Sequence, residues 1–543
     1  MVSLYKGRRG TINFVTTELK KNSIKKKIIK LPIVKTKDSI FTLLLLYRYQ
    51  FMKTILRSLL LLGLLLFSLQ SCEDQDDIAA PANLQINDFI WKGLNQYYLW
   101  QADVPNLSDE RFGNKQSALN SFLSGYAEPE NLFQDLLNKP ASKFPKGEAI
   151  DRFSWIVKDY SVLEQELQGT SKSTGIDFKL SYKGESNSDL VGFVRYVVPG
   201  SDASSKSIKR GDLFTAVNGT PLTASNYRQL LLDSESYTLN LAQYNGNVIE
   251  SNGKSVTLVK TTLNENPILI NKVITSGSHK IGYLMYNGFY STYDSQLNDA
   301  FEELATQGVT DLVLDLRYNG GGSVQTATRL ASMITGQFKD QIFAKEKWNA
   351  KLTAYLETED SESLNNRFVD NINGRAINSL RLSKVYVLTS NGTASASELI
   401  INGLVPYITV VQIGDYTVGK NVGSVTLYDS ETFTKNKVNT SHKYAMQPLV
   451  LKIVNATGFG EYTDGLKPAY EQLEYLSNLG VLGDPSEPLL NTAIAKITGA
   501  SAKKVQQDRG KALRSFIDSK AINGIGNQMY VEKAPEGLLR TLN

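Results

Sequence analysis

The chain has 543 residues, of which 41% are hydrophobic and 21% charged. This composition is typical of globular proteins, and the length exceeds what one hydrophobic core usually organises. The formal net charge is +5, but 14 Lys and Arg residues and two acidic residues precede Cys72, whereas 45 basic and 52 acidic residues follow it. Because the body of the chain is mildly acidic, it lacks the clustered cations of a nucleic-acid-binding surface, and we expect no nucleic-acid partner.

Residues 52–71 have the pattern of a bacterial lipoprotein signal peptide. A short basic stretch beginning at Met52 precedes an apolar run from Ser58 to Leu69, which is short for a membrane span. Cys72, the only cysteine, follows Leu at −3 and Ser at −1, as in a lipobox. The pattern predicts lipid attachment at Cys72 and a cell-envelope location at the outer membrane of a Gram-negative bacterium, facing the periplasm or the surface. The alternative is an anchor helix with an incidental cysteine.

The residues on either side of this signal also have a recognisable character. Residues 1–51 precede a signal that is complete without them, so we interpret them as an upstream extension from a mis-assigned start, with translation beginning at Met52. Residues 72–83 begin with the acidic run Glu73-Asp74-Gln75-Asp76-Asp77 and continue with small residues, which predicts a solvated tether. An acidic run in this place resembles the surface-export signals of Bacteroidetes lipoproteins.

Residues 84–168 show helical periodicity, which predicts a small helical N-terminal domain. The large apolar residues that share one face of the first helix are Phe89, Ile90, Leu94, Tyr97 and Tyr98. The tryptophans of this region, Trp91, Trp100 and Trp155, are expected in the domain core rather than around a ligand.

Between residues 170 and 263 the pattern changes to short strands separated by turn signals. An extended segment runs from Ser173 to Phe178, and Asn218-Gly219 favours a hairpin. These segments resemble a PDZ domain of the circularly permuted bacterial type. The resemblance implies that a substrate tail adds as a strand beside Ile176 and Phe178 while amides around Gly175 receive its terminal carboxylate. The alternative is a β-turn module without a ligand.

Strands and helices alternate in residues 268–500, which predicts an α/β layer structure. The expected strands are 280–285, 311–316, 384–389 and 408–413, and the expected helices are 295–307, 396–404 and 489–497. Residues 501–543 are polar, and we expect them to form a loose C-terminal tail.

Three turns of this region carry residues suited to catalysis. Asp315-Leu316-Arg317-Tyr318-Asn319-Gly320-Gly321-Gly322 follows a buried strand and predicts an anion-binding turn. No Gly-Lys-Ser/Thr follows, so a catalytic oxyanion hole suits this turn better than a phosphate loop. The second turn, 390–398, joins a strand to a helix, so one of its serines is a candidate nucleophile at the helix N-terminus. The third, 414–424, contains Lys420 between glycines.

A serine nucleophile needs a base, and histidine is a poor candidate in this chain. The two histidines, His279 and His442, lie in no recognisable triad setting. A buried lysine can lose its proton near neutral pH, so Lys420 is the better candidate. Taken alone, Lys420 is equally compatible with a solvated charge on a loop.

The three turns together resemble the carboxy-terminal processing (tail-specific) serine peptidases in order and spacing, with Lys420 lying 25 residues beyond Ser395. The segment Thr463-Asp464-Gly465-Leu466-Lys467-Pro468 resembles the closing strand motif of that family. The resemblance implies a mixed α/β (α+β) multidomain chain, in which residues 268–500 form a crotonase-like α/β serine peptidase core behind the helical and PDZ-like domains.

Carried over by position, the resemblance assigns roles to individual residues. It makes Ser395 the nucleophile and Lys420 the general base, with the backbone N–H groups of Gly321 and Ala396 as oxyanion donors. Ser424 stands where the family often has a glutamine, and its hydroxyl is a candidate for orienting the lysine amine.

Two neighbouring residues and the cofactor requirement complete this interpretation. Asp315 and Arg317 are expected to be structural. No cofactor is implied, and two isolated histidines with one cysteine leave no zinc site, so we expect no metal.

The predicted function is therefore that of a serine endopeptidase acting on proteins or peptides with free C-termini. The alternative is a non-catalytic surface lipoprotein that binds peptides or small apolar ligands on the same fold, because a fold alone does not establish an activity.

Overall fold

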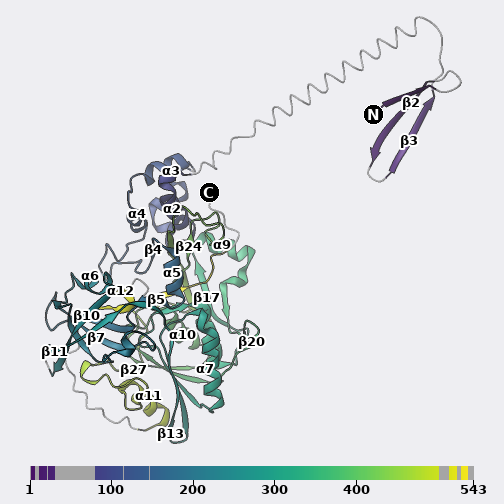
Figure 1. Ribbon diagram of the computed structural model, residues 1–543. Coiled ribbons are helices and arrows are strands. Elements are labelled where there is room, and N and C mark those ends of the chain that lie inside the picture. The colour runs from purple at the N-terminus through teal and green to yellow at the C-terminus, as the bar shows by residue number, and fades with distance from the viewer. Residues whose placement is uncertain are drawn as a thin grey trace, which may run out of the picture. The chain divides into compact units, whose positions relative to one another are not determined.

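The computed structural model describes residues 80–113, 115–145, 147–246, 248–500, 513–522 and 527–535, together with the backbone of three strands near the N-terminus (Figure 1). These strands, β1 (Val2–Lys6), β2 (Ile12–Lys20) and β3 (Ser23–Lys30), form an antiparallel sheet within a unit separate from Ala79–Asn543. The signal peptide, Cys72 and most of the tether lie outside the described residues, so the interpretation of residues 1–79 stays a prediction. In the described part of the chain, no helix combines the length and apolarity needed to cross a membrane.

The helices that follow the tether are α2 (Gln85–Tyr97), α3 (Gln116–Leu123), α4 (Pro129–Asp135) and α5 (Tyr160–Leu167). The five apolar residues expected on one face of α2 are fully buried. Their hydrophobic cluster continues into the second half of the chain, where the ring of Phe89 stacks on that of Phe433 with centroids 6.2 Å apart. Residues 84–168 were expected to form a domain around its own core, whereas α2–α4 share the core of the α/β region.

Trp155 was expected in the helical core, but it begins strand β4 (Trp155–Val157). This strand pairs with β25 (Ala445–Gln447), which in turn pairs with β24 (Leu427–Tyr428). The pairing brings the segment that precedes α5 against the α/β region.

An antiparallel seven-stranded sheet follows α5, in the order β11-β10-β8-β7-β6-β28 with β9 paired to β8. Its strands are β6 (Ile176–Tyr182), β7 (Leu190–Val197), β8 (Leu213–Val217), β9 (Thr220–Pro221), β10 (Ser236–Asn245), β11 (Val248–Val259) and β28 (Ser515–Asp518). Helix α6 (Tyr227–Leu232) packs on a core that includes Phe178 and Phe214. Strands β5 (Thr170–Ser173) and β12 (Thr261–Asn264) pair where the chain enters and leaves this sheet. The PDZ assignment of this region stays a prediction.

A mostly parallel sheet, in the order β13-β14-β15-β21-β22-β27, forms the centre of the α/β region. Its strands are β13 (Ile268–Ser276), β14 (His279–Tyr286), β15 (Asp311–Asp315), β21 (Lys384–Thr389), β22 (Thr409–Gly414) and β27 (Tyr470–Glu471). Successive side chains of a strand point to opposite faces. Tyr283 and Met285 therefore pack with α11 (Pro488–Thr498), whereas Leu284 packs in the cluster formed with α7, α8 and α10. Burial on both faces explains the continuous apolar strands of the sequence.

The helices of the second face are α7 (Asp294–Thr306), α8 (Val324–Thr335) and α10 (Ala396–Leu404), and α9 (Ala350–Glu359) follows β17. A second sheet has the order β16-β29-β23-β26-β17-β18, with strands β16 (Gly321–Ser323), β17 (Ile342–Trp348), β18 (Asn365–Arg367), β23 (Val422–Ser424), β26 (Leu449–Asn455) and β29 (Gln528–Tyr530). A small hairpin joins β19 (Asn371–Ile372) to β20 (Arg375–Ala376). The mixed α/β, multidomain character expected from the sequence is confirmed.

The C-terminal segment departs from the expectation of a loose tail. Within its described residues, β28 joins the edge of the antiparallel sheet, α12 (Ser519–Ile522) follows, and β29 inserts between β16 and β23. Unpaired N–H and C=O groups on a strand edge favour such additions, and a polar sequence gives little sign of them. The described C-terminal residues are therefore part of the seven-stranded sheet, through β28, and of the sheet that contains β16 and β23, through β29.

Candidate active site

Three turns meet at one edge of the parallel sheet because they follow adjacent strands. The glycine-rich turn follows β15, the Ser390–Ser395 turn follows β21, and the turn that leads to Lys420 follows β22. Carboxyl ends of parallel strands lie at the same edge, where α/β sheets generally place their sites. Hydrogen bonds join neighbouring turns: Thr393 Oγ1 donates to Leu316 O at 2.9 Å, and Val418 N donates to Thr393 O at 2.9 Å.

The glycine-rich turn brings its backbone against the serine turn. Gly321 and Gly322 have φ values of +106° and +141°, a region that side chains disfavour. A Cβ on Gly321 would lie 2.5 Å from Ser395 Cβ and 2.9 Å from Ala396 N. Any side chain at this position would therefore fill the space beside the Ala396 amide, where the resemblance places the oxyanion.

Ser395 has a strained backbone at the start of α10. Its φ and ψ are 62° and −117°, and the residue is fully buried. Nucleophilic serines commonly occupy such strained strand-to-helix turns, which expose the hydroxyl to the substrate. Within the described residues, Ser395 Oγ has no hydrogen-bond partner. A buried hydroxyl without a partner is costly in a purely structural residue.

Glu398 joins the serine turn to the lysine turn. Its buried carboxylate accepts hydrogen bonds from Ser395 N at 2.7 Å, Lys420 N at 2.9 Å and Gly419 N at 2.7 Å. The Thr417 hydroxyl donates to the same carboxylate. Burial raises the pKa of Glu398, and these hydrogen bonds act in the opposite direction. One side chain therefore bonds the backbone of both turns, at Ser395 and at Gly419 and Lys420.

Lys420 is 1% exposed and lies under the ring of Phe153, with Nζ 5.0 Å from the ring centroid. Burial lowers its pKa to about 7, Arg152 acts in the same direction, and the Asp151 and Glu398 carboxylates oppose both. A lysine with this pKa is neutral in a large fraction of molecules near pH 7, as a general base requires. In this structure, Lys420 Nζ donates to Asn527 O at 2.7 Å.

Charged residues under the glycine-rich turn form a buried network. The Arg317 guanidinium contacts Asp315, Glu474 and Glu487, with Nη1 to Glu487 Oε1 at 2.7 Å. Burial alone would raise the pKa of Glu474, but Arg210 and Arg317 lower it to about 2. These contacts fit the structural role expected for Asp315 and Arg317, because a buried charge needs partners.

Both histidines of the chain are hydrogen-bonded to aspartates and not to the serine. His279 Nδ1 lies 2.8 Å from Asp311 Oδ2, and His442 Nε2 lies 2.8 Å from Asp429 Oδ2. Neither histidine hydrogen-bonds to Ser395 Oγ, which has no partner among the described residues.

Comparison with known proteins identifies family domains in two segments of the chain. A model of peptidase family S41 matches residues 280–447, which contain all three turns, and a model of the peptidase S41 N-terminal domain matches residues 85–155. Two segments of the chain, residues 85–155 and 280–447, are therefore domains of the peptidase S41 type.

Two sequence relatives and one solved structure illustrate the similarity of this chain to other proteins. It is 27% identical over 267 residues to the chloroplastic C-terminal processing peptidase of Tetradesmus obliquus, covering 47% of this chain and 53%, about half, of that relative. It is 24% identical over 398 residues to a candidate CtpA-like serine protease of Staphylococcus aureus, covering 72% and 68% of the two chains. The crystal structure of a candidate S41 protease from Bacteroides fragilis is 28% identical, with a TM-score of 0.58 over 76% of this chain and 97% of that one.

The chain differs at two predicted site residues from what the sequence suggested. Ser424 Oγ was expected to orient the lysine amine, but it donates to Met529 O at 3.2 Å. Gly321 N was expected to point at an oxyanion, but it donates to Asn319 Oδ1 at 2.8 Å. Both atoms are engaged by neighbouring groups in this state.

The predicted peptide-binding edge of the chain is covered from within. Gly175 N donates to Ser173 Oγ at 3.0 Å, and Phe178 N donates to Ser519 Oγ at 3.1 Å. Strand β28 pairs with the next residues of β6. The edge beside Ile176 and Phe178 was expected to be free for a peptide, and it is not. Gly175 itself is required by packing, because a Cβ there would lie 2.0 Å from Ser201 Cβ.

Sequence reasoning missed three contributors to this site: Glu398, the Arg152-Phe153 pair and Asn527. Only Glu398 had a local signal, because Ser395-Ala-Ser-Glu398 matches the capping-box pattern at a helix start. Arg152 Nη2 donates to Gly419 O at 2.5 Å, although the two residues are 267 positions apart in the sequence. No local sequence pattern predicts such a contact.

Proposed function

We propose that this chain is a serine endopeptidase in which Ser395 is the nucleophile and Lys420 the general base. The observation that carries the proposal is that the buried Glu398 carboxylate accepts hydrogen bonds from the backbone of both Ser395 and Lys420. The S41-type domain and the similarity to a C-terminal processing peptidase support the same reaction class. A protein that only bound peptides would need neither a strained serine nor a buried lysine beside it.

The reaction follows from the geometry of the three turns. Ser395 Oγ attacks the scissile carbonyl carbon, and neutral Lys420 takes the hydroxyl proton. The amide of Ala396, at the N-terminus of α10, stabilises the developing oxyanion, and the missing side chain of Gly321 leaves room for it. Protonated Lys420 then returns the proton to the leaving amine, and water hydrolyses the acyl-enzyme.

The pH profile of peptide hydrolysis tests the identity of the base. Because Lys420 must be neutral and burial lowers its pKa to about 7, kcat/KM is expected to fall about tenfold per pH unit well below 7 and to level off above about pH 8. The measurement is hydrolysis of a quenched fluorescent peptide between pH 5.5 and 9.5 at constant ionic strength. A rate that is flat from pH 5.5 to 8, or that falls as pH rises, would exclude Lys420 as base.

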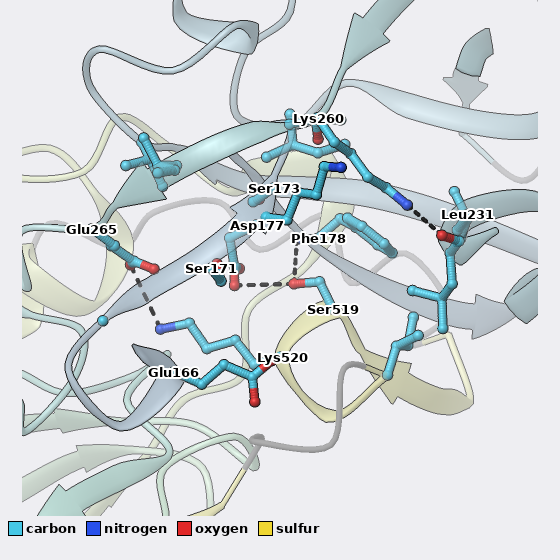
Figure 2. A pocket seen from close by; sticks show the side chains of 18 of the residues that line it. Glu166, Ser171, Ser173, Asp177, Phe178, Leu231, Lys260, Glu265, Ser519 and Lys520 are labelled. Atoms are coloured by element: carbon cyan, nitrogen blue, oxygen red, sulfur yellow. Dashed lines mark hydrogen bonds and ion pairs between the residues drawn. The ribbon is translucent and has the colours of Figure 1, made fainter. Parts of the chain in front are cut away.

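We further propose that the antiparallel sheet recognises the C-terminal tail of a substrate. A cavity of about 410 Å³ lies between β6, α6 and α12, and Figure 2 shows Asp177, Phe178, Leu231 and Lys260 around it. Lys260 lies over the ring of Tyr237, with Nζ 6.0 Å from the ring centroid. The cavity thus combines apolar surface with a cation, the two features that an apolar residue with a free carboxylate needs.

Amidation of a peptide C-terminus tests this recognition. A peptide with a free carboxylate is expected to bind Ser395→Ala protein at least about tenfold more tightly than its amide, because the amide removes the charge that Lys260 would meet. Fluorescence anisotropy with both peptides measures the difference. Equal affinities would refute tail recognition and leave the peptidase proposal untouched.

The lipoprotein pattern before Cys72 supports a cell-envelope location for this activity. An anchor at Cys72 would hold the peptidase at a membrane while its described part meets protein substrates.

A further inference from the structure

The described C-terminal residues follow the path expected for a bound peptide. Strand β28 lies antiparallel to β6, with Ser515 opposite Ser181 and Asp518 opposite Lys179. Helix α12 then places Ser519 against the same strand, where its hydroxyl donates to Asp177 Oδ2 at 3.1 Å (Figure 2). Asp518 Oδ1 also accepts from Arg195 Nη1 at 3.1 Å. An added strand at this edge is how β-augmentation would hold a peptide from another protein.

The next described residues continue into the catalytic site as strand β29. It lies parallel to both β16 and β23, with Gly321 opposite Gln528 and Ser424 opposite Tyr530. Two main-chain hydrogen bonds outside the ladder hold it: Gln528 N donates to Gly320 O at 3.0 Å, and Val531 N donates to Ser424 O at 3.0 Å. Backbone pairing of this kind is independent of side chains, so another extended peptide would fit the same slot.

Carbonyl groups of this strand lie at the catalytic atoms. Lys420 Nζ donates to Asn527 O at 2.7 Å. This hydrogen bond engages the amine that must be free to act as the base in the proposed mechanism. A Cβ on Gly321 would lie 2.2 Å from Gln528 O and 2.5 Å from Ser395 Cβ. The Gln528 carbonyl therefore lies beside the glycine next to the nucleophile. No second peptide can occupy this space while β29 is in place.

We propose that residues 513–522 and 527–535 are an internal occupant of the substrate cleft, and that a substrate binds as an extended strand between β16 and β23 after displacing β29. The substrate strand runs parallel to both neighbours, as β29 does. This proposal rests on the proposed peptidase function for its catalytic consequence. A tethered occupant lowers the apparent affinity of any substrate by the fraction of molecules in which the cleft is open.

Weakening β29 in the full-length chain tests the proposal. Gln528→Pro with Val531→Pro removes the two N–H donors to Gly320 and Ser424. The triple variant, with both prolines and Ser395→Ala, is expected to bind a fluorescein-labelled synthetic peptide of residues 513–535 at least tenfold more tightly than Ser395→Ala protein. Fluorescence anisotropy measures both affinities. Lys533→Pro, an exposed position beyond the end of β29, is the matched control and should bind as the parent does. Equal affinity of the proline pair and the parent would overturn the proposal.

The Gln528→Pro, Val531→Pro double variant that keeps Ser395 distinguishes this proposal from the proposed peptidase function. Hydrolysis of a quenched peptide should become at least tenfold faster. Tighter binding without any hydrolysis would uphold the internal occupant and refute the peptidase, whereas hydrolysis with unchanged binding and rate would refute the occupant alone.

A reversible disulfide cross-link tests the same proposal if the proline variants do not fold. Ser424→Cys with Tyr530→Cys joins opposite residues of β23 and β29, and Cys72→Ala removes the only other thiol. In Ser395→Ala protein, the oxidised form is expected to bind the labelled peptide at least tenfold more weakly than the form reduced with dithiothreitol. The single-cysteine variants should show no redox dependence. Failure to form the disulfide, or equal binding by both forms, would contradict the proposal.

Discussion

Ser395→Ala is expected to lower kcat/KM for peptide hydrolysis by at least about 10⁴-fold, because it removes the atom that forms the acyl-enzyme. The fold should survive, since Ser395 Oγ has no hydrogen-bond partner among the described residues and the Glu398 bond is made to the backbone. Steady-state hydrolysis of a quenched peptide measures the loss, and thermal unfolding measures the stability.

Ser397→Ala is the matched control for this prediction. Its hydroxyl is equally buried two residues further along α10, but it donates to Asn319 O at 3.0 Å and supports the glycine-rich turn. The expected cost is about 1–2 kcal/mol of stability from the unpaired carbonyl, with activity reduced far less than in Ser395→Ala. Similar activity losses in the two variants, or substantial hydrolysis by folded Ser395→Ala, would show that Ser395 is not the nucleophile.

Lys420→Met is expected to lower kcat by at least about 10³-fold without unfolding the chain. Methionine fills a similar volume, and it removes a charge that burial already disfavours, so the melting temperature should stay the same or rise. Lys420→Arg should be as inactive, because the guanidinium stays protonated and cannot accept the serine proton. The measurements are single-turnover hydrolysis and thermal unfolding of both variants.

Lys443→Met is the control for loss of a lysine elsewhere. Lys443 pairs with Asp159 on the surface, and its side chain is 56% exposed, so its replacement should leave both rate and pH profile unchanged. If folded Lys420→Met hydrolysed the peptide at the parental rate, another base would operate and the proposed mechanism would be wrong.

The sequence determined the chemistry of the candidate site. Ser395 and Lys420 stand in turns after apolar strands, and those strands were recognisable because both their faces are buried, as in residues 384–389, which form β21. Adjacent parallel strands end at one edge of a sheet, so the pattern of strands by itself predicts that the two turns lie together. The need for glycine at Gly321 and Gly322 is also a local property, since both residues adopt backbone angles that other residues disfavour.

The tertiary structure decided which groups complete the site and which ones occupy it. Phe153 contacts Lys420, and Arg152 donates to Gly419 O from 267 residues earlier in the sequence. A long-range contact of that kind leaves no periodicity in a single chain. The C-terminal segment was expected to be a loose tail because it is polar, and β28 and β29, at four and three residues, are too short to show a strand pattern. Their docking depends on backbone hydrogen bonds to strand edges formed by distant residues, and every residue other than proline offers the same backbone N–H and C=O groups.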